Sequence, residues 1–151
     1  MRDRSRPVAL ALIAPALLIG AAPPPAGGDV VVVATGLRSV NGVVRACMTS
    51  ERQHFPACRD ATSSYNAVGE AGPRVVLTFR DVRPGRYAVA LLHDENGNGK
   101  ADRAAMMIPR EGFGFSRDAK VRFGPPKFGE AAFDVGAGAH DTLVIRMRYM
   151  L

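Results

Sequence analysis

The sequence predicts an all-β domain that folds as a two-sheet antiparallel β-sandwich of about seven strands. Short runs of β-branched or alternating apolar residues recur along the chain, and turn residues separate them. The 16 Gly and 11 Pro favour frequent turns over long helices, and no stretch has a convincing helical period. With 151 residues, 47% of them hydrophobic, the chain can bury the core of one ordinary domain.

The first strands are expected on either side of an Asn-Gly turn. Residues 30–37 form a β-branched run, and Asn41-Gly42 then favours a hairpin that pairs this run with residues 43–49. The second run alternates, with Val44, Ala46 and Met48 on one face. Residues 50–73 show no clear pattern, so a short helix and a long loop both remain open there.

Two further strands are expected around a Pro-Gly turn. Residues 74–80 alternate apolar and polar side chains, which is typical of a half-buried strand. Pro84-Gly85 supplies a turn, and we expect the Tyr87 hydroxyl to bond back to upstream backbone, as tyrosines at sandwich corners do. Residues 86–93 are apolar on both faces, which indicates a central strand.

The second half of the chain predicts shorter elements. Short strands are expected at 106–108, 121–124 and 130–135, and the aromatic, glycine-punctuated segment 109–116 is expected to fold back on the domain. Gly136-Ala137-Gly138 indicates a turn. The last strand is the clearest, because one face carries four alternating apolar side chains: Leu143, Ile145, Met147 and Tyr149.

The N-terminus has the parts of a secretory signal. Three arginines within the first six residues precede an apolar run over 8–22, and small residues end that run. The run is shorter than the about 20 residues that span a bilayer, although an uncleaved anchor is an alternative. We therefore expect a signal peptide at 1–22, a flexible leader at 23–29 and one sandwich domain at 30–151. The mature form would have no transmembrane segment.

The charge of the chain is mildly basic. Removing residues 1–22 takes away three Arg and one Asp, so the formal net charge falls from +6 to +4. The basic residues are spread out, and no basic run is interleaved with aromatics as nucleic-acid binding would require. Anionic lipid headgroups or glycans are conceivable contacts, and a merely soluble basic surface is the simpler interpretation.

Two cysteines fit an oxidising compartment. Cys47 and Cys58 form an even pair, which in an exported chain predicts a disulfide. In the chain-entropy account, closing so short a loop adds about 3 kcal/mol of stability. A Cys-His-Cys metal site that includes His54 is the alternative. We expect the protein in the periplasm, outside the cell or associated with the outer membrane.

The most distinctive stretch is AVALLHDENGNGKAD, over residues 88–102, in which a strand runs into a loop rich in Asp, Asn and Gly. In calcium loops of the EF-hand type, positions 1, 3, 5 and 9 supply side-chain oxygens and position 7 a backbone carbonyl. Counted from the first Asp, these positions predict a weak Ca²⁺ site, with the following ligands: Asp94, Asn96, Asn98, Lys100 through its carbonyl, and Asp102.

The loop also departs from that pattern. Position 12 is Ala105 instead of a bidentate Glu, so Glu111 or water would have to complete the coordination sphere. Binding should therefore be on the order of 10⁻⁴ to 10⁻³ M, as in extracellular modules. The alternative is a tight loop in which Asp and Asn side chains bond their own backbone.

His93 precedes the loop and lies directly beside Asp94. A His beside an Asp can be half of a catalytic pair, but it more often bonds a loop structurally. His93 is therefore an accessory candidate at most. The sequence contains no nucleophile elbow, HExxH helix or phosphate-binding glycine loop.

Several blocks resemble one bacterial family. FRDVRPGRYAVALLHDENGNGKAD, PREGFGFS, GPPKFGEAAFDV and the alternating final strand are similar to exported proteins grouped as domain of unknown function 2141. The resemblance covers residues 30–149. It implies an exported immunoglobulin-like or prealbumin-like β-sandwich, and it implies no particular biochemical activity.

These observations favour a non-enzymatic exported module with a binding or structural role in the cell envelope. Its partner would be an envelope protein or a glycan, contacted through the loop end of the sandwich. The alternative is a small-molecule hydrolase of the transthyretin-related kind that uses His93 and nearby arginines. That class has a characteristic C-terminal tail, which residues 146–151 do not resemble.

Overall fold

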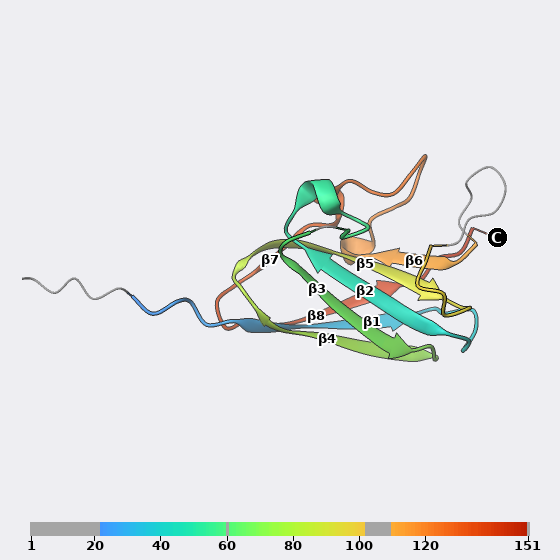
Figure 1. Cartoon of the computed structure of the whole chain (residues 1–151), viewed down its shortest axis with the longest axis horizontal. Helices are drawn as coiled ribbons and strands as arrows, with labels where there is room; N and C mark the ends of the chain where they lie inside the picture. The colour runs from blue at the N-terminus through green and yellow to red at the C-terminus, as the bar shows by residue number, and fades with distance from the viewer. Residues whose placement is uncertain (1–21, 60, 102–109, 151) are drawn as a thin grey trace, which may run out of the picture.

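The protein is an all-β sandwich of two sheets, as the sequence predicts (Figure 1). The computed structural model describes residues 22–59, 61–101 and 110–150. Within these residues the chain forms eight strands: β1 Gly28–Thr35, β2 Val43–Thr49, β3 Ser64–Glu70, β4 Arg74–Val82, β5 Gly85–Asp94, β6 Gly112–Phe115, β7 Phe133–Val135 and β8 His140–Arg146. Three short helical segments connect them: η1 Arg52–His54, η3 Ser116–Asp118 and α1 Phe128–Ala131.

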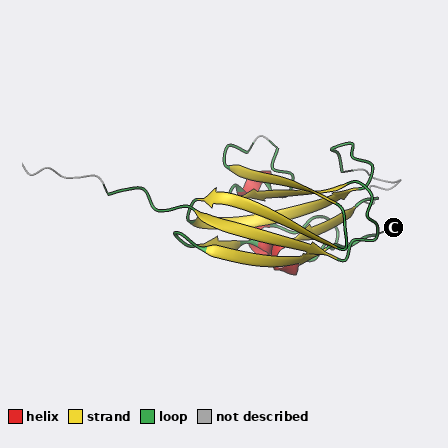
Figure 2. Cartoon of the chain, turned by 90° about the horizontal axis from the view of Figure 1, so that it is seen from below, coloured by secondary structure: helices red, strands yellow, loops and turns green. Residues whose placement is uncertain are grey.

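The strands divide between two layers, which Figure 2 shows from below. One sheet has the order β4-β1-β8, and the other has the order β3-β2-β5-β6, with β7 pairing β5. The prediction of a purely antiparallel sandwich is wrong at one place, because β1 and β8 run parallel. These two strands come from opposite ends of the domain, so no tight turn dictates their direction.

The prediction of a hairpin between β1 and β2 is also wrong, because the two strands lie in different sheets. Both edges of β1 are taken, by β4 and β8, while β2 pairs with β3 and β5 in the other sheet. Each strand turns one apolar face to the same core, for example Val32 of β1 and Val44 of β2. The Asn41-Gly42 turn therefore passes the chain from one layer to the other, and covering the core prevails over local pairing.

Strand alternation builds the core as predicted. Along β4, Val75, Leu77 and Phe79 are buried between the sheets, and the intervening side chains are exposed. β5 lies between β2 and β6, which makes it the central strand that its apolar sequence predicts. The Tyr87 hydroxyl donates a hydrogen bond to the Arg83 carbonyl at 3.0 Å, which confirms the predicted corner.

Several elements lie in segments where the sequence pattern was unclear or predicted a different structure. Residues 50–73 contain η1 and the edge strand β3. The prediction of a strand at 121–124 is wrong. These residues form a bend ahead of two prolines, which have no N–H to donate to a sheet. The strand expected at 130–135 begins only with β7, and the turn of α1 precedes it. The expected strand at 106–108 lies outside the described residues.

One predicted element, the disulfide, is confirmed, and it joins β2 to the segment after η1. Cys47 and Cys58 are bonded, with their Cα atoms 6.3 Å apart. The segment so fixed carries Phe55, whose ring packs edge-on against Phe115 and Phe128 at 5.9 and 6.1 Å. A second apolar cluster thus covers part of the outer face of the larger sheet.

The leader and the C-terminal residues lie at opposite ends of the sandwich (Figure 1). The described part of the chain contains no helix that is long and apolar enough to cross a membrane. The loop that follows β5 lies at the same end as the C-terminus.

Candidate functional site

The predicted calcium loop begins at Asp94, the last residue of β5, whose side chain is fully buried. Its Oδ1 accepts a hydrogen bond from the Asn98 amide at 3.0 Å, and its Oδ2 accepts one from the Gly99 amide at 2.8 Å. The same Oδ2 accepts a bond from Arg45 Nε at 2.7 Å. Arg45 comes from β2, the strand beside β5, so a guanidinium already neutralises this carboxylate.

The two asparagines also bond the loop backbone. Asn96 Oδ1 accepts from the Asn98 amide at 3.1 Å, and Asn98 Oδ1 accepts from the Lys100 amide at 2.8 Å. Gly97 and Gly99 have φ angles of +69° and +74°, which glycine adopts without steric cost. The loop is thereby closed by its own amides, which is the arrangement expected of a tight structural loop.

The sequence also predicts Asp102 as a ligand and Glu111 as an accessory ligand. Asp102 lies outside the described residues, and Glu111 is buried in the lining of a cavity on the outer face of the larger sheet. Among the described residues, no group of three or more His, Cys, Asp or Glu side chains is arranged to hold a metal ion.

The bonds to Asp94 make stability depend on pH. Burial alone would raise the pKa of Asp94, but the bonds from Arg45, Gly99 and Asn98 outweigh burial and hold this pKa below its usual value. A lowered pKa in the folded state contributes stability that is present above the unfolded pKa and is lost as pH falls through the folded pKa. We therefore expect stability to fall below about pH 4, where an unfolded Asp titrates.

Urea unfolding from pH 7 to pH 2 tests this expectation. Asp94→Asn should be less stable than wild type at pH 7, and the gap should narrow as the pH falls. Asp134→Asn is the matched control, since it removes the same charge from a side chain that is 75% exposed. A gap between Asp94→Asn and wild type that stays constant with pH would contradict the assignment.

His93 is fully buried at the end of β5 and has both ring nitrogens engaged. Nε2 lies 2.9 Å from the Asn41 carbonyl, which can only accept, so Nε2 donates this hydrogen bond. Nδ1 shares a hydrogen bond of 2.7 Å with the Tyr149 hydroxyl. His93 therefore ties the β1–β2 connection to the C-terminal tail, and the structural interpretation of this residue fits the geometry.

A polar cluster that the sequence did not indicate surrounds this histidine. Arg38 bonds Glu95 through Nε at 3.1 Å, and the Ser39 hydroxyl donates to the same carboxylate at 2.6 Å. The bond from Arg38, followed by Ser39, lowers the pKa of Glu95 despite its partial burial. Arg38 also lies 4.7 Å from the centre of the Tyr149 ring, within cation–π distance. These contacts hold the loop end of the sandwich together.

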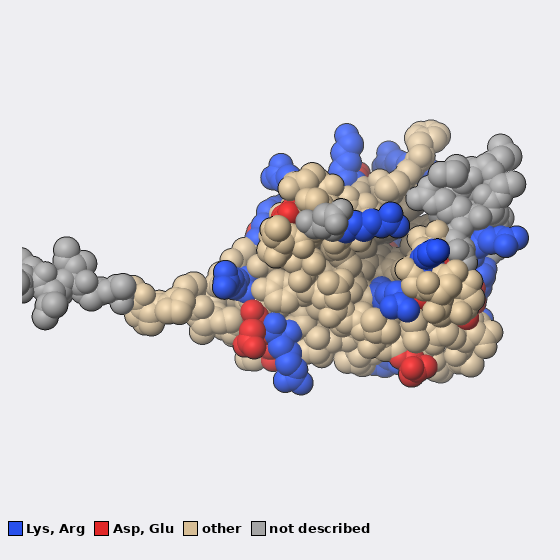
Figure 3. Space-filling view, in the orientation of Figure 1, with Lys and Arg blue, Asp and Glu red and all other residues tan. Residues whose placement is uncertain are grey.

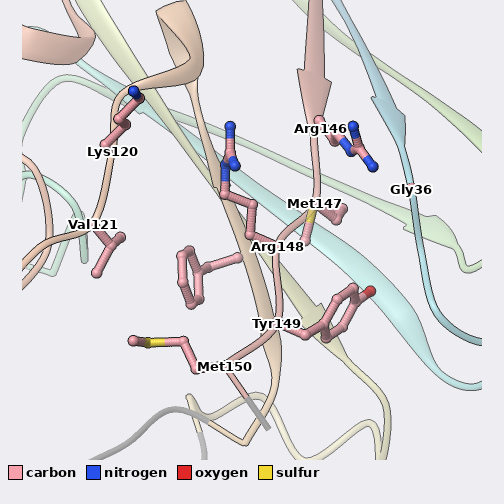
Figure 4. Close-up of a pocket in the computed structure, with 9 residues that line it drawn as sticks. Gly36, Lys120, Val121, Arg146, Met147, Arg148, Tyr149 and Met150 are labelled. Atoms are coloured by element: carbon pink, nitrogen blue, oxygen red, sulfur yellow. The ribbon is translucent and has the colours of Figure 1, made fainter.

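A cavity of about 670 Å³ opens beside the C-terminal tail (Figure 4). Three cationic side chains, Lys120, Arg146 and Arg148, line it together with apolar residues, and its described lining contains no Asp or Glu. A second cavity, of about 880 Å³, lies on the outer face of the larger sheet. Both volumes fall in the range of small-molecule sites.

The two cavities adjoin, because Phe113, Val121 and Met150 line both. This region was not predicted from the sequence. Arg146 and Arg148 alternate along the final strand, which was a usable signal, whereas nothing near Lys120 marks it as their neighbour.

The sequence profile of one bacterial family, described as "Uncharacterized protein conserved in bacteria (DUF2141)", matches residues 32–142. The match covers most of the sandwich, from β1 into β8. No curated protein and no solved structure matches the chain.

Proposed function

Because the chain belongs to the DUF2141 family, whose description assigns no activity, we propose a function from the site: an exported, non-enzymatic module that binds a component of the cell envelope. The observation that carries the proposal is the cavity lined by Lys120, Arg146 and Arg148. Exposed cations beside apolar side chains can hold an anionic ligand without performing any reaction on it.

Two further features support a location outside the cytoplasm. The basic and apolar pattern of residues 1–22 is that of a secretory signal. The Cys47–Cys58 disulfide is of a kind that persists in oxidising compartments. Periplasm, outer membrane and medium are all compatible with both features.

The hydrolase alternative has less support. It requires His93 to face a substrate together with arginines, and His93 is fully buried with both nitrogens engaged by Tyr149 and Asn41. Neither cavity is lined by a histidine among the described residues. A general base needs hydrogen-bond reach to a substrate proton, which this burial denies it.

Envelope retention of the full chain tests the proposal. Expressed in bacteria, the chain should lose its first residues, as N-terminal sequencing would show, and should sediment with envelope fractions. The double variant Lys120→Gln/Arg146→Gln should release it into the soluble fraction, whereas Arg80→Gln, an exposed arginine of β4, should not. An uncleaved cytoplasmic chain would refute the proposal, and so would equal retention of both variants.

We propose calcium binding by the loop as a second property. Asp94, Asn96 and Asn98 belong to one tight loop and carry side-chain oxygens of the kind that Ca²⁺ prefers. Arg45 opposes this, because its guanidinium bonds the Asp94 oxygen that a cation would also need. Calcium and Arg45 should therefore compete.

The competition predicts that Arg45→Gln strengthens calcium binding. At about 10 mM CaCl₂, above the expected 10⁻⁴ to 10⁻³ M affinity, the melting temperature should rise in the wild type and rise further in the variant. Each protein is compared with its own chelator-treated sample, so any stability change from the substitution cancels. Arg80→Gln should respond like the wild type. If neither protein responds, the loop is purely structural.

A further inference from the structure

We propose that the two adjoining cavities form one site for a single-chain anionic amphiphile, such as an alkyl phosphate. This inference rests on the proposed binding function and specifies its ligand. The anionic head would lie among Lys120, Arg146 and Arg148, and the alkyl chain would extend over Phe113, Val121 and Met150 into the larger cavity.

The head end of this site is cationic. In Figure 4 the nitrogen-bearing ends of Lys120, Arg148 and Arg146 lie across the upper part of the view, and Val121 and Met150 lie below them. Asp118 bonds Arg148 at 2.6 Å from outside the lining, and no ion pair is seen at Lys120 or Arg146 within the described residues. The site thus keeps positive charge for an anion. Figure 3 shows several Lys and Arg side chains along the upper margin of one face of the molecule.

Backbone pairing between β6 and the C-terminal tail brings these side chains together. Phe113 and Arg148 exchange backbone hydrogen bonds of 3.0 and 2.8 Å across an antiparallel bridge, so their side chains lie side by side. Alternation then gives Arg146, Arg148 and Met150 the same side of the tail.

Two glycines allow this close packing. A Cβ on Gly36 would lie 3.2 Å from Cγ of Arg146, so glycine leaves room for the arginine stem. A Cβ on Gly114 would lie 2.8 Å from Ile145 and 3.2 Å from the Arg146 carbonyl. The tail can therefore lie flat against β6, where its cations border the cavity.

The tail end of the site is apolar. Beyond the three shared residues, the larger cavity is floored by Ala90, Leu92 and Phe115 from β5 and β6. Its margin carries Arg45, Arg59, Arg122 and the buried Glu111, of which Arg45 is engaged by Asp94. A free inorganic anion would leave this floor uncovered, and a second copy of the chain would bring like charge to the cations. An anion that carries an alkyl chain would pair with the cations and would also cover the apolar floor.

Titration calorimetry with decyl phosphate, below the concentration at which it forms micelles, tests the proposal. We expect saturable binding of one molecule per chain. Shortening the chain to octyl phosphate should weaken binding roughly tenfold, because each buried methylene contributes about three- to fourfold. Inorganic phosphate and the neutral decyl maltoside should each bind at least about tenfold more weakly than decyl phosphate.

Variants locate the site. Lys120→Gln/Arg146→Gln should weaken decyl phosphate binding about tenfold or more, since it removes two charged donors. Val121→Ser should reduce the difference between the octyl and decyl ligands. Arg74→Gln/Arg80→Gln, which removes the same two charges from an exposed face of β4, should bind like wild type. Melting curves of each variant confirm that it is folded.

Each contrary result overturns the assignment. Equal binding of inorganic and decyl phosphate would leave only an anion site, and equal binding of decyl maltoside would leave only an apolar surface. Binding unchanged in Lys120→Gln/Arg146→Gln would place the ligand elsewhere. If decyl phosphate fails to bind while the wild-type chain is still retained by envelopes in a Lys120- and Arg146-dependent way, the ligand class is wrong and the proposed function stands.

Discussion

Replacing Gly42 by alanine should lower the free energy of unfolding by about 3 kcal/mol or more, the sum of backbone strain and steric overlap. Gly42 has a φ of +70°, and a Cβ there would lie 2.0 Å from the Asp94 carbonyl oxygen. The turn between β1 and β2 would have to move away from the end of β5. That movement would also disturb the bond from His93 to the Asn41 carbonyl.

Alanine substitutions at two other glycines distinguish the cost of backbone strain from the cost of steric overlap in the same measurement. Gly97→Ala meets nothing within 4 Å but keeps a φ of +69°, so it should cost about 1 kcal/mol. Gly72→Ala meets nothing within 4 Å and has no positive φ, so it should be nearly neutral. Urea unfolding of the three variants should rank them in this order. A Gly42→Ala variant as stable as Gly97→Ala would show that the turn is not in close contact with β5.

Removing the disulfide is the second large effect. The double variant Cys47→Ala/Cys58→Ala should lose about 3 kcal/mol, because the bridge closes a short loop in the unfolded chain. The same segment carries Pro56, Ala57 and Arg59, which line the larger cavity. We therefore expect weaker decyl phosphate binding in this variant as well.

Reductant provides the control for the disulfide. Dithiothreitol should lower the urea midpoint of the wild type toward that of Cys47→Ala/Cys58→Ala and leave the double variant unchanged. A double variant as stable as oxidised wild type would mean that packing of Phe55 against Phe115 and Phe128 suffices to hold the segment.

Burial periodicity explains which parts of the fold could be predicted. β4 and β5 are recognisable because one face must be apolar wherever a strand covers a core, and this leaves a pattern in the sequence. Strand partners leave no such pattern. The continuous valines of β1 fit a central strand equally well beside β2 or beside β8, and closure of the core across 111 residues, Val32 to Leu143, decides between them.

Edge strands and single turns escape prediction for a related reason. All residues of β3 are at least partly exposed, so Ser64–Glu70 had no need of strict alternation. α1 is four residues long, too short to show a helical period, and it forms because the Glu130 carboxylate accepts the Lys127 amide at 2.7 Å while Phe128 and Ala131 become buried.

Only part of the candidate site could be predicted from the sequence, because some of its residues lie far apart along the chain. The Asp, Asn and Gly content marked the loop after β5, since these residues act on backbone two to five positions away. Arg45, which forms an ion pair with Asp94, lies 49 residues earlier and reaches it only through the pairing of β2 with β5. Lys120, Arg146 and Arg148 likewise meet only through the fold.

The parallel pairing of β1 with β8 has a consequence for biogenesis. Until the final strand emerges from the ribosome, one edge of β1 has no partner and the smaller sheet stays open. The smaller sheet therefore cannot be completed before β8 has been synthesised. Such delay would suit a precursor that must thread through a translocation channel in extended form before it folds on the far side.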